Sequence, residues 1–140
     1  MNDSARPVSV HEALIYAMVT LSAADTRMTD REVAKIGDIV RSLPVFSDFD
    51  MELLIPAAKA CGALLQCEDG LDRVLGAIAM ALPKRLHETA YALAVEVTAA
   101  DLHAEQEELR FLQLLRDKLD LDPLATAAIE RSARARYRTL

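Results

Sequence analysis

Tryptophan is absent from this sequence of 140 residues, and aromatic residues of all kinds make up only 4% of it. Glycine is also scarce, with four residues. β-Sheets favour β-branched and aromatic side chains, and their tight turns rely on glycine. Because these residues are in short supply while alanine and the aliphatic residues are abundant, the composition favours an all-α protein.

The sequence also lacks a long apolar stretch. No uncharged run approaches the roughly 18 residues of a membrane span, and the first residues, MNDSARPVSV, lack the apolar segment of a signal peptide. Acids outnumber bases by 22 to 16, which gives a net charge of −6, whereas a nucleic-acid-binding protein needs a basic surface. We therefore expect a cytoplasmic protein of one domain, residues 1–140, with no transmembrane segment and no nucleic-acid partner.

The motifs of common catalytic and cofactor sites are missing as well. The sequence has no glycine-rich phosphate loop, no G-x-S-x-G and no H-E-x-x-H. His11, His87 and His103 never follow a glutamate by three residues, so the Glu-x-x-His pairs of di-iron bundles are absent. We therefore expect no enzymatic activity and no catalytic residue. His103, in an expected turn, is either solvated or a ligand for a softer metal.

The sequence contains two cysteines, Cys61 and Cys67. Six residues on one helix would separate them by about 120° around the axis and about 9 Å along it, too far for a disulfide. We expect two buried thiols in a reducing compartment. A thiol metal site is the alternative, but C-x-x-C spacing and a nearby histidine are missing.

Apolar residues recur at helical spacing along most of the chain, which predicts a compact bundle of about seven helices. Short loops favour antiparallel neighbours. The helices are expected at about 9–24, 29–42, between Ser47 and Cys67, 70–82, 84–100, 104–119, and from Pro123 onward.

Several helix boundaries carry specific signals. Ser9 and Thr29 each precede a glutamate by three residues, the pattern of a capping box. Asp122 followed by Pro123 predicts the start of the last helix. Pro56 falls inside the third expected helix, so this helix is either kinked or begins near Ile55.

The tripeptide Ala-Ala-Asp occurs twice, ending at Asp25 and, 76 residues later, at Asp101. Glu32 and Glu108 follow these aspartates at the same spacing of seven. The apolar positions around both segments also correspond. We therefore expect two helical hairpins of one design, related by pseudo-twofold symmetry, each with an acid at its turn and another early in its second helix.

An aspartate at a helix C-terminus is disfavoured by the helix dipole, so its repetition calls for an explanation. One interpretation is a cap, in which Asp25 and Asp101 accept hydrogen bonds from the next helix. The other is a divalent cation site, because carboxylates are ligands for calcium and magnesium. Glu32 has a capping role, but position 105, equivalent to Thr29, is a glutamate, so Glu108 lacks that explanation.

The repeated AAD…E pattern, the segment HETAYALAVEVTAAD and the segment FLQLLRDKLDLDP resemble the tellurite resistance protein TerB family over about 9–135. That family's fold is related to the N-terminal domain of the DnaJ-like membrane co-chaperone. The resemblance implies a compact seven-helix fold, no catalytic activity and an acidic patch that binds metal. It also implies a role in tellurite resistance or general stress response, acting through protein partners at the membrane. Its metal ligands would here be Asp25, Glu32, Asp101 and Glu108.

The last ten residues contain four arginines and no acid. Three of them, Arg131, Arg134 and Arg138, share one helical face. They either complement the dipole of a helix end or attach the protein to an acidic partner or a membrane surface. Glu96 is expected to be an ordinary surface charge, with a buried acid as the alternative.

Together these patterns predict a non-enzymatic binding or adaptor module that works through protein partners. A divalent cation, calcium or magnesium, bound by the paired acids is part of this hypothesis, and peripheral membrane association is compatible with it. The first alternative is a structural interaction domain without metal. The second is a metal-dependent hydrolase that uses the same carboxylates.

Overall fold

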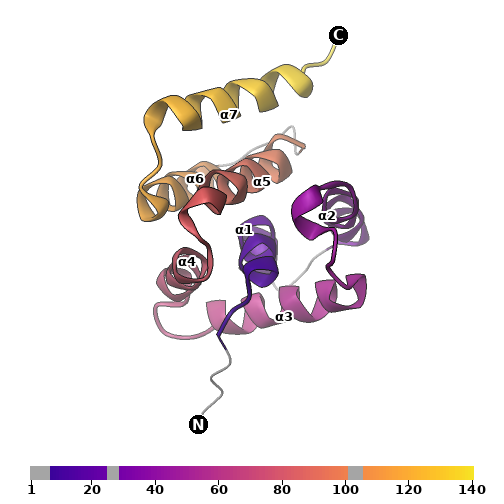
Figure 1. Ribbon diagram of the computed structural model, residues 1–140, viewed down its shortest axis with the longest axis vertical. Coiled ribbons are helices and arrows are strands. Elements are labelled where there is room, and N and C mark those ends of the chain that lie inside the picture. The colour runs from indigo at the N-terminus through magenta and orange to yellow at the C-terminus, as the bar shows by residue number, and fades with distance from the viewer. Residues whose placement is uncertain (1–6, 25–28, 101–105) are drawn as a thin grey trace.

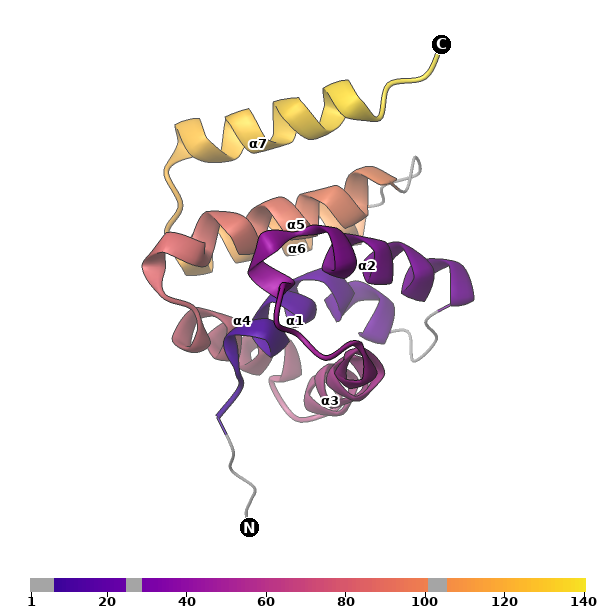
Figure 2. The same ribbon diagram turned by 45° about the vertical axis from the view of Figure 1, so that its right-hand side comes forward.

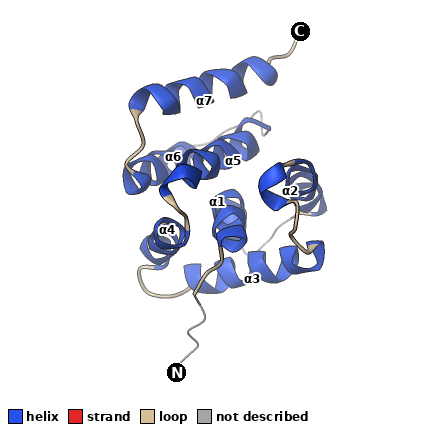
Figure 3. Ribbon diagram, in the orientation of Figure 1, coloured by secondary structure: helices blue, strands red, loops and turns tan. Residues whose placement is uncertain are grey.

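The computed structural model describes residues 7–24, 29–100 and 106–140. Within these ranges it contains seven α-helices and no strand (Figure 1, Figure 3). The α-helices are α1 (Val10–Ala24), α2 (Asp30–Ser42), α3 (Leu54–Leu65), α4 (Gly70–Ala81), α5 (His87–Ala100), α6 (Gln106–Leu119) and α7 (Pro123–Arg136). Three short 3-10 helices precede α3 and α5, namely η1 (Pro44–Phe46), η2 (Met51–Leu53) and η3 (Lys84–Leu86).

Helices account for 82% of the described residues, which confirms the predicted all-α class. The seven α-helices correspond to the seven expected ones, with ends that differ by a few residues. None of the described helices is both long enough and apolar enough to cross a bilayer.

The first two helices begin as the sequence predicts. The Ser9 hydroxyl accepts a hydrogen bond from the Glu12 N–H at 3.0 Å, and the Glu12 carboxylate accepts one from the Ser9 N–H at 2.9 Å. The same reciprocal pair joins Thr29 and Glu32 at the start of α2. Each box satisfies N–H groups that have no partner within the helix.

Two prolines also lie at helix starts. Pro123 is the first residue of α7, and the Asp122 carboxylate accepts from the Leu124 N–H at 3.2 Å. The third helix begins at Leu54, so Pro56 lies in its first turn, where a missing N–H removes no helical hydrogen bond. The late start of this helix is therefore confirmed, and the kinked alternative is wrong.

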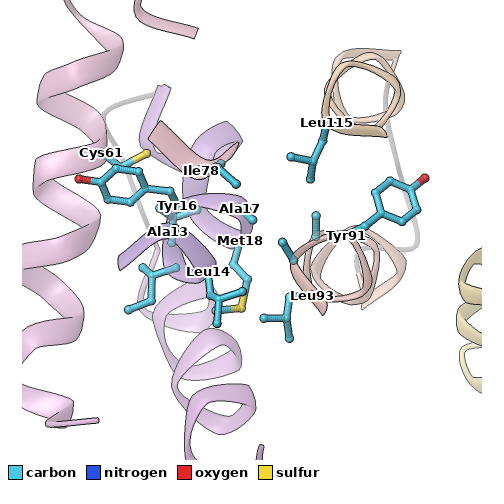
Figure 4. Close-up of a cluster of buried hydrophobic side chains, with 14 of the residues drawn as sticks. Ala13, Leu14, Tyr16, Ala17, Met18, Cys61, Ile78, Tyr91, Leu93 and Leu115 are labelled. Atoms are coloured by element: carbon cyan, nitrogen blue, oxygen red, sulfur yellow. The ribbon is translucent and has the colours of Figure 1, made fainter. Parts of the chain in front are cut away.

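Helix α1 forms the centre of the molecule. Every residue from Ala13 to Thr20 is buried, so the helix is covered on all sides and not along one stripe. It packs against α3, α4 and α5. In Figure 4, Tyr16 points toward Cys61 on α3, whereas Met18 points toward Leu93 on α5. A helix that is apolar all round is stable in water only when others surround it in this way.

The two expected hairpins are the pairs α1–α2 and α5–α6. The first helices of the two pairs, α1 and α5, pack against each other. The helix that follows each pair packs on the first helix of that pair: α3 packs on α1, and α7 packs on α5 (Figure 1). Helices α5 and α6 pack directly. Among the described residues α1 and α2 make few contacts, because α3, α4 and α5 already occupy the surface of α1.

The predicted apolar faces are mostly buried. On α6, Phe111, Leu112, Leu115 and Leu119 are all in the core. On α4, helical spacing places Leu71 on the same face as Val74, Leu75 and Ile78, which are buried, but Leu71 itself is 36% exposed. Leu71 lies in the first turn of α4, directly after a turn in which residues 66–69 are all exposed, so no neighbouring element covers it.

The same turn corrects the prediction for the cysteines. Both are free thiols, and Cys61 is fully buried on α3. Because α3 ends at Leu65, Cys67 lies in the turn and is exposed. Burial raises the pKa of Cys61 to about 11, an effect that its contact with the Thr20 hydroxyl at 3.8 Å only partly offsets.

Gly70, the first residue of α4, is required by close packing. A Cβ atom at this position would lie 2.3 Å from the carbonyl oxygen of Leu65, which is backbone and cannot turn aside. Asp69 precedes it in the left-handed region, with φ of 56°. The sharp turn from α3 into α4 therefore depends on the absence of a side chain at Gly70.

We expect Gly70→Ala to lower the free energy of unfolding by about 2 kcal/mol, because the added methyl forces the backbone apart. Gly76→Ala is the matched control. A Cβ at Gly76 meets nothing within 4 Å, and alanine is the better helix former, so this variant should gain about 0.5 kcal/mol. Urea unfolding followed by circular dichroism measures both changes, and equal effects of the two variants would contradict this account.

We expect a thiol reagent such as DTNB at pH 8 to modify one cysteine in the folded chain and two in the denatured chain. The exposed Cys67 reacts, whereas Cys61 is shielded and has a pKa of about 11. In Cys67→Ser the fast reaction should disappear. Rapid reaction in that variant would show that Cys61 is accessible.

Candidate functional site

The predicted cation ligands are divided between described and undescribed parts of the chain. Asp25 and Asp101 lie outside the described residues, as does His103. Glu32 and Glu108 are described, and each lies in the first turn of its helix, α2 or α6. The helix ends that lead into the two aspartates and the starts of α2 and α6 all lie toward the right-hand side of Figure 2.

Glu32 has the capping role that the sequence predicts. Its Oε1 atom accepts hydrogen bonds from the N–H and from the hydroxyl of Thr29, both at 3.1 Å. The Thr29 hydroxyl in turn accepts from the Glu32 N–H at 3.1 Å. The residue is half-buried.

Glu108 occupies the corresponding place in α6, where it is half-buried beside the exposed Glu107. Acids in a first turn are favoured by the helix dipole. Within the described ranges, no group of three or more His, Cys, Asp or Glu side chains comes together to hold a metal ion. Because two of the four proposed ligands lie outside those ranges, the cation site stays a prediction.

A second polar cluster joins α2, α5 and α7, and the sequence does not predict it. We call it the Tyr137 cluster; its members are Lys35, Glu96, Ser132, Arg136 and Tyr137. The Lys35 ammonium donates to the Tyr137 hydroxyl at 2.9 Å and lies 5.3 Å from the centre of the ring. The Tyr137 hydroxyl donates to Glu96, which also accepts from Arg136. Arg136 donates to the Ser132 hydroxyl at 2.6 Å.

These contacts change the ionisation of two groups. Burial raises the pKa of Glu96, but hydrogen bonds from Tyr137 and Arg136 outweigh it, so the pKa falls below its ordinary value of 4.5. The hydrogen bond to Tyr137 raises the pKa of Lys35, and this exceeds the opposite effect of burial. Both groups are therefore charged at neutral pH. Glu96 is only 22% exposed and has two hydrogen-bonding partners, so its prediction as an ordinary surface charge is wrong.

A groove of about 570 Å³ runs beside this cluster between α2, α5 and α7. Its walls are mainly apolar, with Ile39 and Leu43 on one side and Ile129 on the other, and Glu96 and Arg136 are among its lining residues. Because these two groups already bind each other, neither is poised as a general base or a nucleophile. The groove is therefore a poor candidate for a catalytic centre.

A third cluster fixes the other half of α7 to the bundle. The Tyr91 hydroxyl, on a fully buried residue of α5, donates to Glu130 at 2.5 Å. Arg116 on α6 donates to the same carboxylate oxygen at 2.9 Å. Burial, followed by the contact with Glu130, raises the pKa of Tyr91 well above its usual range. The phenol therefore stays protonated and continues to donate across the pH range of ordinary experiments.

Only one weak signal in the sequence pointed to these clusters. In the expected helix Arg136 is off the face shared by Arg131, Arg134 and Arg138, and in the structure it is the one of the four that pairs with a described acid of the bundle. Its partner Glu96 is 40 residues away in the chain, and no local pattern relates the two.

Comparison with models of protein families matches residues 11–131 to the family described as "Tellurite resistance protein TerB". Searches of curated proteins and of solved structures gave no match. The matched span begins in the first turn of α1 and ends within α7, so it includes all four proposed cation ligands. Arg136 and Tyr137 lie beyond it.

We expect Glu96→Gln to lower stability by roughly 1–2 kcal/mol at pH 7, because two hydrogen bonds to a charged acceptor are weakened. A folded pKa below 4.5 means that the carboxylate stabilises the fold above that pH and loses this effect as the pH falls further. The difference between the two proteins should therefore shrink between about pH 5 and pH 3 in urea unfolding. The control is Glu68→Gln, at an exposed position in the turn between α3 and α4, for which no such change in the difference is expected.

Proposed function

Because the chain belongs to the tellurite resistance protein TerB family, we propose that it is a non-enzymatic binding module of a tellurite-resistance or stress-response system. The family match over residues 11–131 carries this proposal. The pairing of Glu96 with Arg136 supports it, because the groove between α2, α5 and α7 then offers no activated group. We further propose that the module works in the cytoplasm through protein partners, some of them associated with the membrane.

We propose that Asp25, Glu32, Asp101 and Glu108 bind a divalent cation, calcium or magnesium. The repeat of Asp and Glu at one spacing supports this, as does the equivalent, half-buried position of the two glutamates in α2 and α6. Carboxylates brought together repel one another, and a hard cation relieves that repulsion.

Two alternative functions use the same residues. The reciprocal hydrogen bonds between Thr29 and Glu32 favour the first alternative, an interaction domain in which the acids only cap helices. A metal-dependent hydrolase would need a nucleophile or a base beside the bound ion, and the sequence provides no motif for one.

We expect millimolar calcium or magnesium to raise the melting temperature, because a ligand that binds only the folded state stabilises it by mass action. Asp101→Asn should remove this increase with little effect on the metal-free protein, since asparagine also caps turns. The matched control is Asp72→Asn on α4, an exposed position at which the increase should persist.

The capping alternative predicts a different result. The melting temperature would not respond to calcium, magnesium, manganese or zinc, and Asp101→Ala would lose about 1 kcal/mol of stability. A flat response to all four ions would overturn the cation site and leave an interaction domain.

A further inference from the structure

Three arginines at the C-terminal end of the chain point away from the bundle. Arg131 and Arg134 on α7, and Arg138 just after it, are all exposed. Within the described ranges, none of the three has an acidic oxygen within 4.0 Å, although acids outnumber bases in the chain. Arg131 and Arg134 are three residues apart on α7, and like charges at this spacing along a helix repel each other, so this arrangement is unfavourable in the isolated molecule.

The other arginines next to α7 behave differently. Arg136 pairs with Glu96 on α5, and Arg116 pairs with Glu130 at 2.9 Å. Of the four arginines in the last ten residues, Arg136 is therefore paired with an acid of the bundle, whereas Arg131, Arg134 and Arg138 are not paired with any described acid. The helix dipole accounts for Arg134 in the last turn, but Arg131 lies in the middle of α7 and Arg138 lies beyond its end.

The rest of this outer surface is uncharged. Leu124 is 79% exposed, and Ala127, Ala128 and Ala135 are also exposed. Small side chains allow another backbone to approach closely, and a large exposed leucine is a contact point for an apolar side chain. Helix α7 is the outermost element of the molecule in both Figure 1 and Figure 2, so its outer face is accessible along its whole length.

We propose that this arginine face, defined by Leu124, Arg131, Arg134 and Arg138, docks an acidic amphipathic helix of a partner protein. Carboxylates three and four residues apart on the partner pair with the three guanidinium groups, whose planar forks bind carboxylates in a bidentate manner. An apolar side chain of the partner covers Leu124. The proposal rests on the proposed role as a binding module, but it does not require the cation.

The same observations disfavour an anionic lipid surface or a nucleic acid as the partner. The exposed large apolar side chains here are Leu124 at one end and Leu140 at the other, with arginines and small residues between them, so the face has no continuous apolar stripe to insert into a bilayer. The molecule is negative overall, with a charge of −6, and would be repelled by an extended polyanion. An isolated acidic helix matches both the length and the charge of the face.

The test uses two fluorescein-labelled synthetic helices of identical composition. In the first, glutamates recur at spacings of three and four on one face with leucines at both ends; in the second, the same residues are spread around the axis. Fluorescence anisotropy with the full chain should show at least tenfold tighter binding of the first helix. The variant Arg131→Gln/Arg134→Gln/Arg138→Gln should lose at least tenfold of that affinity.

The matched control is Lys59→Gln/Arg73→Gln/Arg85→Gln, which makes the same change of charge at exposed positions on α3, α4 and η3. Its affinity should stay within twofold of that of the unmodified chain. Circular dichroism checks that both variants are folded. Equal binding of the two helices, equal loss in the control variant, or no binding of either helix would overturn the proposal.

A further titration measures binding of the protein to vesicles of phosphatidylserine and phosphatidylcholine. Arginine-dependent binding to these vesicles that is tighter than binding to the first helix would overturn the protein partner in favour of a membrane. All titrations are repeated in EDTA and in millimolar calcium. Helix binding in EDTA, together with a melting temperature that no cation changes, would support the arginine face while the cation site fails. A melting temperature that rises with the cation, without binding of the helix, would support the cation site and overturn the arginine face.

Discussion

The burial of α1 on every side is the constraint on which the rest of the fold depends. Its residues from Ala13 to Thr20 are removed from water, and burial of apolar surface is the dominant favourable contribution to folding. Helices α3, α4 and α5 are needed to cover it. Among the described residues α2 makes few contacts with α1, and α7 rests on α5 at the outside of the bundle. The inner helices therefore provide stability, and the outer ones are free to present charged groups.

Helix α7 shows what this arrangement requires of an outer helix. Its buried residues are only Thr126 and Ala133, which are too small to form a large apolar contact. Polar clusters at two places along the helix compensate for this. Glu130 is bound by a tyrosine and an arginine of the bundle, and Tyr137 bridges α2 and α5. Hydrogen bonds of this kind fix direction and register, which the alanine-rich surface of α7 cannot do by shape alone.

Features set by neighbouring residues were predictable from the sequence, and features set by distant ones were not. The capping boxes at Ser9 and Thr29, and the proline at the start of α7, depend on residues within three positions of one another, so pattern alone located them. The exposure of Leu71 and Cys67 depends on which element covers a particular turn, and periodicity contains no such information. For the candidate site, the capping bond of Glu32 was predictable. The partners of Glu96 were not, because they are 40 and 41 positions away.

The absence of tryptophan gives the tyrosines an optical consequence. The intrinsic ultraviolet fluorescence then comes mainly from three tyrosines. The Tyr91 hydroxyl donates to Glu130 on α7, and the Tyr137 hydroxyl donates to Glu96 on α5, so both hydrogen bonds join α7 or its end to the bundle. A phenol bonded to a carboxylate transfers its proton readily on excitation, so its emission at ordinary tyrosine wavelengths is weak. Displacement of α7 would separate both phenols from their carboxylates, so the ultraviolet emission of the unlabelled protein should brighten when that helix leaves the bundle.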